Sequence, residues 1–322
     1  MLLPHSRLIS HLVRAFGVAS VVVCFGAVEA GAAPKVGVLL KDKSPGFWVY
    51  ADQGAQATAA QLGAEVIVKA PPTVLDMTAQ PRLLAALAAD KIDALVIAPT
   101  NPEAVEAAVA ALAAKGVKIV TVDTPLKDGV AQVFVGADQA ALGDAAAKVF
   151  LSVVRDGDEV AMLRNNSVDR TVMIREEKLR EALRTRSGLI FHGDIYASSD
   201  KDSEDERALL LLTKYPKVTA VFASATRGTL STIKAIREKG LVGKVKVVGF
   251  GTYLPAEAAK AFEDGILVGW VAQEPRDLGV KAVRAAVALV NGTESPPVVR
   301  PDFLLVTSEN FHSAEAQALL HP

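Results

Sequence analysis

The chain has 322 residues, and its 35 Lys and Arg residues against 36 Asp and Glu residues give a formal net charge of −1 at pH 7. This balance provides no electrostatic footprint for nucleic acid or for an anionic membrane, so we expect the partner to be a small molecule or a protein. At about 100–200 residues per domain, the length predicts two domains.

The first 33 residues have the order of a cleavable secretory signal. Basic side chains precede an apolar run over residues 15–27, and small residues follow it. The run is shorter than the about 20 residues that a helix needs to span a bilayer. We therefore expect residues 1–33 to be a signal peptide cleaved near Ala32 and the mature protein to be periplasmic. The only cysteine, Cys24, lies in this run, so we expect no disulfide in the mature chain.

After this leader, short Val- and Ile-rich runs alternate with Ala-rich stretches at helical spacing. We predict strands over residues 35–40, 65–68, 94–97, 118–122 and 133–135, and a second series over residues 159–163, 190–195, 220–223, 244–250 and 267–271. We predict helices over residues 47–62, 102–115, 139–154, 172–183, 228–239 and 277–290. This order predicts an α/β fold with parallel sheets covered by helices, built as two similar halves in tandem.

The candidate ligand contacts directly follow the predicted strands, because open α/β sheets bind ligands at the carboxyl ends of their strands. In the first half these residues are Lys41, Asp42, Phe47, Trp48, Ala98, Thr100, Asp123 and Thr124. In the second half they are Arg164, Asn165, Asn166, Ala225, Thr226, Gly251, Thr252 and Tyr253. This polar and aromatic set is suited to holding a small polar molecule.

Four stretches of the sequence resemble the type I periplasmic solute-binding proteins, and most of all the ribose-like sugar-binding branch. They are KSPGFWVYADQGAQATAAQLG, VIAPTNPEAVEAAVAALAAKGVKIVTVDT, VGADQAALG and VVGFGTYLPAEAAKAFEDGILVGWVAQEP. The similarity covers essentially the whole mature chain in order. It implies a protein that captures a sugar or a sugar-like polyol and delivers it to the permease of an ABC transporter.

The resemblance also implies two Rossmann-like lobes joined by a three-segment hinge, which close on a ligand between them. The chain is expected to cross between the lobes near residues 136–138, 271–273 and 301–304. The first lobe then comprises residues 34–136 plus 274–302. The second lobe comprises residues 137–273 plus 303–322.

Five positions carry over from the family to this sequence. Phe47 and Trp48 match the aromatic pair that stacks on the sugar ring, and Asp123 matches a carboxylate that accepts ring hydroxyls. Arg175 matches an arginine early in a helix of the second lobe, and Gln273 matches a hinge glutamine. Each has a structural alternative: one aromatic ring could fix its helix to the sheet, the aspartate could cap a turn, the arginine could lie on a solvated helix face, and the glutamine could serve the hinge alone.

Three positions depart from the ribose-like pattern. Ala98 stands where the family carries asparagine, Ala225 and Thr226 stand where it carries an Asn-Asp pair, and Gly251 stands where it carries aspartate. Each missing partner would leave a ribose hydroxyl buried without a hydrogen bond, at about 1–3 kcal/mol. We therefore expect a ligand other than ribose.

Other side chains replace the missing partners, or the ligand has fewer hydroxyls. The candidate replacements are Lys41, Asp42, Arg164, Asn165, Asn166, Thr252 and Tyr253. The basic side chains of Lys41, Arg164 and Arg175 would also suit an anionic group on the ligand.

The sequence does not favour an enzyme. It contains no glycine-rich dinucleotide turn after the first predicted strand, no phosphate loop, no His-Glu-x-x-His helix and no G-x-S-x-G elbow. We therefore expect no cofactor, no metal and no catalytic residue. The alternative to transport is a ligand-sensing periplasmic protein that docks on a signalling receptor. We expect a monomer in either case.

Overall fold

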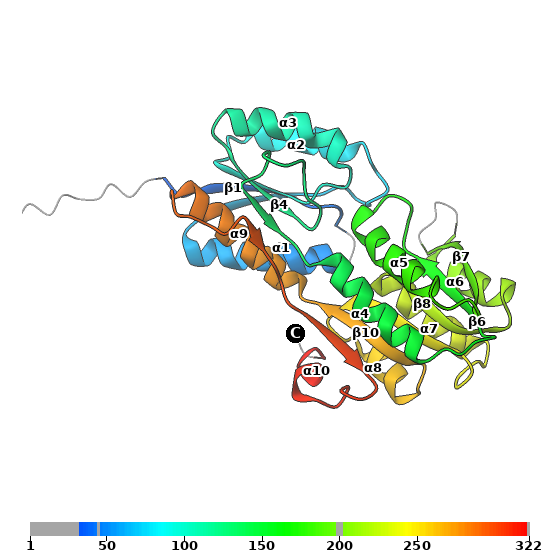
Figure 1. The fold of residues 1–322 in the computed structure, drawn as a ribbon. Coiled ribbons are helices and arrows are strands. Elements are labelled where there is room, and N and C mark those ends of the chain that lie inside the picture. The colour runs from blue at the N-terminus through cyan, green and yellow to red at the C-terminus, as the bar shows by residue number, and fades with distance from the viewer. Residues whose placement is uncertain (1–31, 44–45, 198–201, 321–322) are drawn as a thin grey trace, which may run out of the picture. The chain divides into compact units, whose positions relative to one another are not determined.

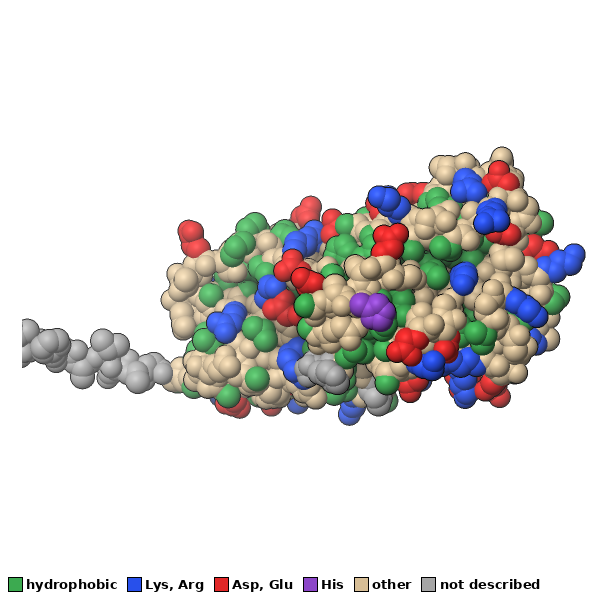
Figure 2. Space-filling view, turned by 90° about the horizontal axis from the view of Figure 1, so that it is seen from below, with side chains coloured by type: hydrophobic (Ala, Val, Ile, Leu, Met, Phe, Trp, Pro, Cys, Tyr) green, Lys and Arg blue, Asp and Glu red, His purple; other side chains and the backbone are tan. Residues whose placement is uncertain are grey.

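A computed structural model describes residues 32–43, 46–197 and 202–320 (Figure 1). The predicted signal peptide therefore lies outside the described residues, apart from its last two positions. Within the described ranges, no helix is long and apolar enough to cross a membrane. The face shown in Figure 2 mixes acidic and basic side chains without a large field of one sign, as the near-zero net charge predicts.

The first sheet has the strand order β11-β5-β4-β3-β1-β2, and all its neighbouring strands are parallel. Its strands are β1 (Lys35–Leu39), β2 (Glu65–Lys69), β3 (Ala94–Ile97), β4 (Lys118–Val122), β5 (Val133–Val135) and β11 (Val298–Val299). The central β3 is buried at every position. This burial requires helices on both faces of the sheet.

Four helices cover the first sheet: α1 (Phe47–Leu62), α2 (Ala79–Ala89), α3 (Pro102–Ala114) and α9 (Pro275–Val290). α1 and α9 contribute to the core on one face, and α2 and α3 to the core on the other (Figure 1). α1 and α9 approach very closely: a Cβ atom at Gly54 would lie 2.0 Å from the Arg276 carbonyl oxygen, and one at Gly279 would lie 2.0 Å from that of Ala51. Only glycine fits at these two contacts.

The second sheet has the strand order β12-β10-β9-β8-β6-β7, with β12 antiparallel to β10 and the other pairs parallel. Its strands are β6 (Glu159–Arg164), β7 (Ile190–Tyr196), β8 (Val218–Ala223), β9 (Lys246–Thr252), β10 (Leu267–Gln273) and β12 (Phe303–Thr307). Helices α4 (Gln139–Ser152) and α5 (Arg170–Leu183) pack on one face. The other face is covered by α6 (Glu204–Lys214), α7 (Thr226–Glu238), α8 (Ala256–Glu263) and α10 (Ala314–Ala318).

The chain passes from one sheet to the other three times: between β5 and α4, between β10 and α9, and between β11 and β12. We call each sheet with its helices a lobe. Residues 33–322 nevertheless form one compact unit by their contacts. The lobe boundaries expected from the sequence, residues 34–136 plus 274–302 and 137–273 plus 303–322, therefore stay a proposal.

The predicted α/β class is confirmed, with two sheets that are parallel except for the pair of β10 and β12. Each predicted strand and helix lies within about two residues of its observed bounds. Helices α2, α6, α8 and α10 and strands β11 and β12 are not among the elements predicted from the sequence. These elements are short, between 2 and 11 residues. Short elements show little periodicity, so their bounds are hard to read from the pattern alone.

Candidate binding site

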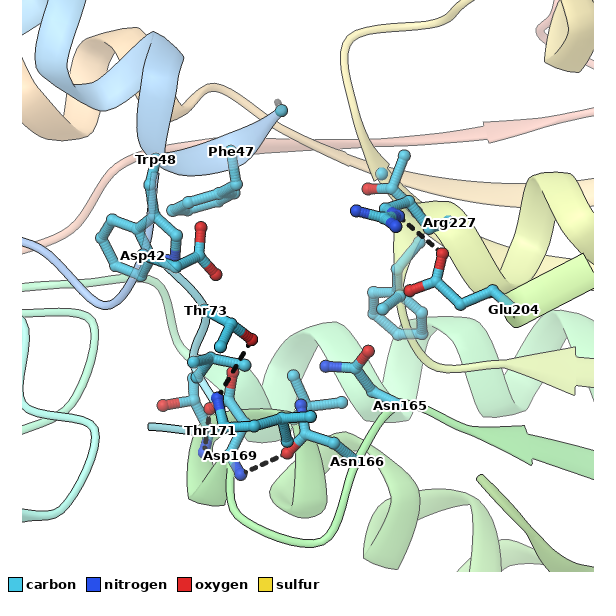
Figure 3. A pocket seen from close by; sticks show the side chains of 18 of the residues that line it. Asp42, Phe47, Trp48, Thr73, Asn165, Asn166, Asp169, Thr171, Glu204 and Arg227 are labelled. Carbon is cyan, nitrogen blue, oxygen red and sulfur yellow. Dashed lines mark hydrogen bonds and ion pairs between the residues drawn. The ribbon is translucent and has the colours of Figure 1, made fainter. Parts of the chain in front are cut away.

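A cavity of about 400 Å³ lies between residues that follow the strands of both sheets. Its volume falls within the range of small-molecule sites. Figure 3 shows Asp42, Phe47 and Trp48 on one side of the cavity and Asn165, Glu204 and Arg227 on the other, with Asp169 and Thr171 between them. The cavity therefore lies where the strand order predicted a ligand site.

The aromatic wall of the cavity is built by the first turn of α1. Phe47 and Trp48 meet edge to face, with ring centroids 5.0 Å apart. Trp48 is buried and belongs to the core between α1, α9 and the first sheet, whereas Phe47 is half-buried against that core. Trp48 therefore fixes the helix to its sheet as well as lining the cavity, and Phe47 has the more accessible ring.

Asp123 follows β4, lines the cavity and is buried. Its φ of 62° lies in the left-handed region, which aspartate tolerates better than most residues. One carboxylate oxygen, Oδ2, accepts a hydrogen bond from Lys41 Nζ at 2.7 Å. The strand end and this ion pair together fix the direction of the Asp123 carboxylate.

Lys41 is not part of the cavity lining, and only 1% of its surface is exposed. Its ammonium donates to Asp123 at 2.7 Å and to Asp169 at 3.0 Å. Burial alone would lower the pKa of Lys41, but the two carboxylates outweigh it and raise that pKa above its ordinary value. The same contacts hold the pKa of Asp169 below its ordinary value, although burial acts in the opposite direction.

Arg175 is also buried and faces the cavity from α5. Its Nε donates to Gln139 at 2.5 Å, its Nη2 donates to Gln273 at 3.3 Å, and its guanidinium lies 4.8 Å from the ring centroid of Phe250. Burial lowers the pKa of Arg175, and the neighbouring Asp123 and Asp169 partly offset that effect. The alternative that Arg175 lies on a solvated helix face is wrong.

The wall of the second lobe combines amide and hydroxyl groups. Asn165 and Thr226 line the cavity, as does Asn166. The Asn166 side-chain oxygen accepts from the backbone of Val168 and Asp169, at 2.9 and 2.7 Å, so this residue shapes the turn before α5. Asn165 projects toward the cavity in Figure 3.

Three further predicted contacts, Arg164, Tyr253 and Thr252, lie outside the lining of this cavity. Arg164 is paired with Glu176 at 2.7 Å and stacks 4.4 Å from the ring centroid of Tyr196. Tyr253 meets Tyr50 edge to face, with ring centroids 4.9 Å apart, and lines a separate hollow with Glu274 and Arg276. Thr252 is buried at the end of β9 and is likewise outside the lining.

The proposed anion site of three basic residues is not assembled. Lys41 and Arg164 are each engaged by carboxylates, and Arg175 is held by two glutamines and by the Ser224 carbonyl at 3.4 Å. The expectation fails because these basic side chains are paired with residues distant in the sequence, and a position after a strand does not reveal such pairing.

Several lining residues were not singled out from the sequence. They are Thr73 after β2, Asp169 and Thr171 at the start of α5, and Glu204 and Arg227 at the starts of α6 and α7. Arg227 donates to Glu204 at 2.5 Å. The sequence could have indicated these residues, because a helix that follows a strand begins at the same edge of the sheet at which the strand ends.

The three departures from the ribose-like pattern have different surroundings. Ala225 and Gly251 line the cavity, whereas Ala98 is fully buried outside it. A Cβ atom at Gly251 would lie 1.7 Å from Cζ2 of Trp270. The indole ring therefore occupies the space that a side chain at position 251 would need.

Among the described residues, no group of three or more His, Cys, Asp and Glu side chains is placed to hold a metal ion. The cavity offers aromatic rings, carboxylates, amides and one buried guanidinium. Such groups can stack on a sugar ring and make charge-assisted hydrogen bonds to its hydroxyls.

Residues 36–294 match the model of a family described as the periplasmic binding protein domain. The chain is 27% identical to the D-allose-binding periplasmic protein of Escherichia coli over 289 residues, which cover 87% of this chain and 92% of that protein. It is 26% identical to the ribose import binding protein of Bacillus subtilis, covering 85% and 87% of the two chains.

Solved structures show the same fold. A periplasmic component of an ABC-type sugar transport system from Hahella chejuensis superposes with a TM-score of 0.77 at 26% identity, covering 85% of this chain and 100% of that one. A solute-binding protein from Agrobacterium vitis with bound D-fucose has a TM-score of 0.81 at 22% identity, covering 89% and 100%.

Proposed function

Because this chain belongs to the periplasmic binding protein family, we propose that it captures a neutral sugar or sugar-like polyol and delivers it to an ABC permease. The observation that carries the proposal is the cavity itself. The rings of Phe47 and Trp48 line it together with the buried Asp123 of the first lobe and the buried Arg175 of the second lobe.

The groups in the cavity fit a sugar in two ways. Aromatic faces cover the C–H face of a pyranose or furanose ring, and the buried carboxylate and guanidinium bind its hydroxyls. Phe47 and Trp48 supply the first contact. Asp123, Arg175 and Gln273 supply the second, with Asp42, Asn165 and Thr226 as further polar partners.

The named relatives are import and binding proteins for ribose and D-allose, which supports transport over signalling. Ala225 and Gly251 leave two lining positions without a hydrogen-bonding side chain. We therefore propose a ligand that makes fewer hydroxyl contacts with the second lobe than ribose makes in the ribose-like branch.

We propose that the protein is exported and acts alone. Residues 1–33 act as a signal peptide cleaved near Ala32, so the mature protein works in the periplasm. It works as a monomer without a cofactor, and its relatives are solute-binding proteins, not enzymes.

The test is a thermal-shift screen against D-allose, D-ribose, D-arabinose, D-fucose and D-tagatose, with nucleosides and small sugar acids as other classes of ligand. A sugar at 100 times its dissociation constant adds about 2.7 kcal/mol of stability, which raises the melting temperature by several degrees. Fluorescence of Trp48 and Trp270, the two tryptophans, checks each hit.

The matched variants are Phe47→Ala and Phe191→Ala. Phe47 lines the cavity, whereas Phe191 lies on β7 outside it. We expect the first variant to lose the sugar-dependent shift and the second to keep it. A shift with another class of ligand, and with no sugar, would show that the ligand class is wrong. Equal shifts in both variants would place binding elsewhere.

A further inference from the structure

The ammonium of Lys41 is held by carboxylates from both lobes. Lys41 follows β1 and Asp123 follows β4, so both belong to the first lobe. Asp169 is the N-cap residue of α5 in the second lobe. Lys41 Nζ lies 2.7 Å from Asp123 Oδ2 and 3.0 Å from Asp169 Oδ1. The contact between Lys41 and Asp169 therefore ties one lobe to the other.

A second polar contact joins the lobes at the same place. The hydroxyl groups of Thr124 and Thr171 lie 2.7 Å apart, and both residues are buried. Lys41 Nζ also lies 3.4 Å from the Thr171 hydroxyl. These contacts use protein groups only, so they need no ligand to form.

Because Lys41 is charged and buried, the contact between the lobes depends on the carboxylates that pair with its ammonium. A buried ammonium is costly unless it is paired and hydrogen-bonded, and removing one partner of a buried pair is strongly unfavourable. If the lobes separate, Lys41 keeps Asp123 and gains water, but loses Asp169. In the structure Lys41 is only 1% exposed, and Asp169 supplies the second partner of its ammonium.

We propose that Asp169 is a positioning residue that, through Lys41, holds the two lobes closed before any ligand binds. The ligand then selects an arrangement that is already populated. The inference depends on the contacts between the lobes and not on the identity of the ligand, so it can fail while the proposed function stands.

The test measures the separation of the lobes without ligand. Spin labels are placed at Ala85→Cys in α2 and Leu210→Cys in α6, two exposed helix positions on opposite lobes, in a Cys24→Ser background of the full chain. Double electron–electron resonance then gives the populations of short and long distances between the two spin labels.

The decisive variant is Asp169→Asn. Asp169 Oδ1 accepts from the Thr171 backbone at 3.2 Å, and asparagine caps a helix about as well as aspartate. The substitution therefore removes the charge and keeps the cap. We expect the wild type to populate mainly the short separation, and Asp169→Asn to lower the ratio of short to long separations at least tenfold.

The matched control is Glu103→Gln. It removes an exposed ion pair between the lobes, in which Glu103 and Arg170 side chains are 62% and 60% exposed and 2.8 Å apart. Exposed pairs contribute little, so we expect no change in the distribution. Equal distributions for Asp169→Asn and wild type, or a wild type found only at the long separation, would overturn the proposal.

Circular dichroism verifies that each variant is folded. If Asp169→Asn does not fold, Lys41→Met tests the same contact from the other lobe, because it leaves the two carboxylates without their shared cation. We expect the same loss of the short separation, and its persistence in this variant would also overturn the proposal.

Discussion

The end of β4 and the end of β9 occupy equivalent places in the two lobes, but they present opposite chemistry to the cavity. β4 is followed by Asp123, whose carboxylate is buried and paired with Lys41. β9 carries Gly251 at its end, where the ring of Trp270 from β10 fills the space for a side chain. One wall is thus organised by charge and the other by packing, so the two should respond to different perturbations.

The largest effect is expected from Trp270→Ala. Trp270 is fully buried, and its indole N–H donates to the Tyr253 carbonyl at 2.8 Å. Removing a buried tryptophan side chain costs about 3–5 kcal/mol of unfolding free energy. Urea denaturation measures the loss, with Trp270→Phe as the control that keeps most of the ring volume. A Trp270→Ala protein as stable as wild type would contradict packing as the organising force of this wall.

Asp123→Ala should destabilise the other wall through charge. It removes the nearer partner of a buried ammonium, and breaking such a pair costs about 3–5 kcal/mol when no other partner remains. Asp169 does remain, so we expect a loss of about 2–3 kcal/mol. The matched control is Asp128→Ala, an exposed aspartate of the same lobe, which should change stability little. Similar effects of both variants in urea denaturation would refute the argument.

Gly251→Ala should introduce a clash with Trp270, since the new Cβ atom would lie 1.7 Å from Cζ2 and 2.4 Å from Cη2. Overpacking of this kind costs about 1–3 kcal/mol. Because the cause is a single neighbour, the double variant Gly251→Ala/Trp270→Leu should lose less stability than the sum of the two single variants. Strict additivity in a double-mutant cycle would show that the clash is relieved elsewhere.

The smallest expected effect is a dependence of stability on pH, which should distinguish the charged wall from the packed wall. Burial raises the pKa of Asp169, but Lys41 and Arg175 outweigh it, so the pKa in the folded protein lies below the ordinary value. Such a group adds stability at pH values above its pKa in the unfolded chain, about 3.9. That stability is lost as the pH falls through the pKa in the folded protein. Asp123, the other acid facing Lys41, stays in place in this comparison.

The measurement compares wild type with Asp169→Asn between pH 7 and pH 3. We expect the stability difference between them to shrink at acid pH, while the deficit of Trp270→Ala, which involves no titratable group, stays constant. A difference that grows on acidification would mean that the sign of the Asp169 pKa shift is wrong.

The two walls also differ in how far the sequence predicts them. Asp123 could be placed in the cavity because it directly follows a strand, and Phe47 and Trp48 because they open a helix at the same edge. The sequence shows a glycine at position 251, but not why a side chain is missing there. The reason is the ring of Trp270 on the neighbouring strand. Such pairings depend on the register between strands, which no local pattern contains.

Lys41 shows a second limit. Its place after β1 suggested a ligand contact, yet its ammonium is paired with Asp123 and with Asp169 from the other lobe. The fold class follows from alternating apolar runs, because burial of a sheet on both faces leaves a local trace. The pairing of charges across two lobes leaves none.

The close approach of α1 and α9 at Gly54 and Gly279 has a consequence for biosynthesis. α1 is among the first elements to be translated, whereas its partner α9 emerges only after β6 to β10 of the other lobe. Until then, the apolar face of α1 has no helix to cover it, and the first lobe cannot be completed in the order in which its residues leave the ribosome. The first lobe must therefore finish folding late, after most of the second lobe has been made.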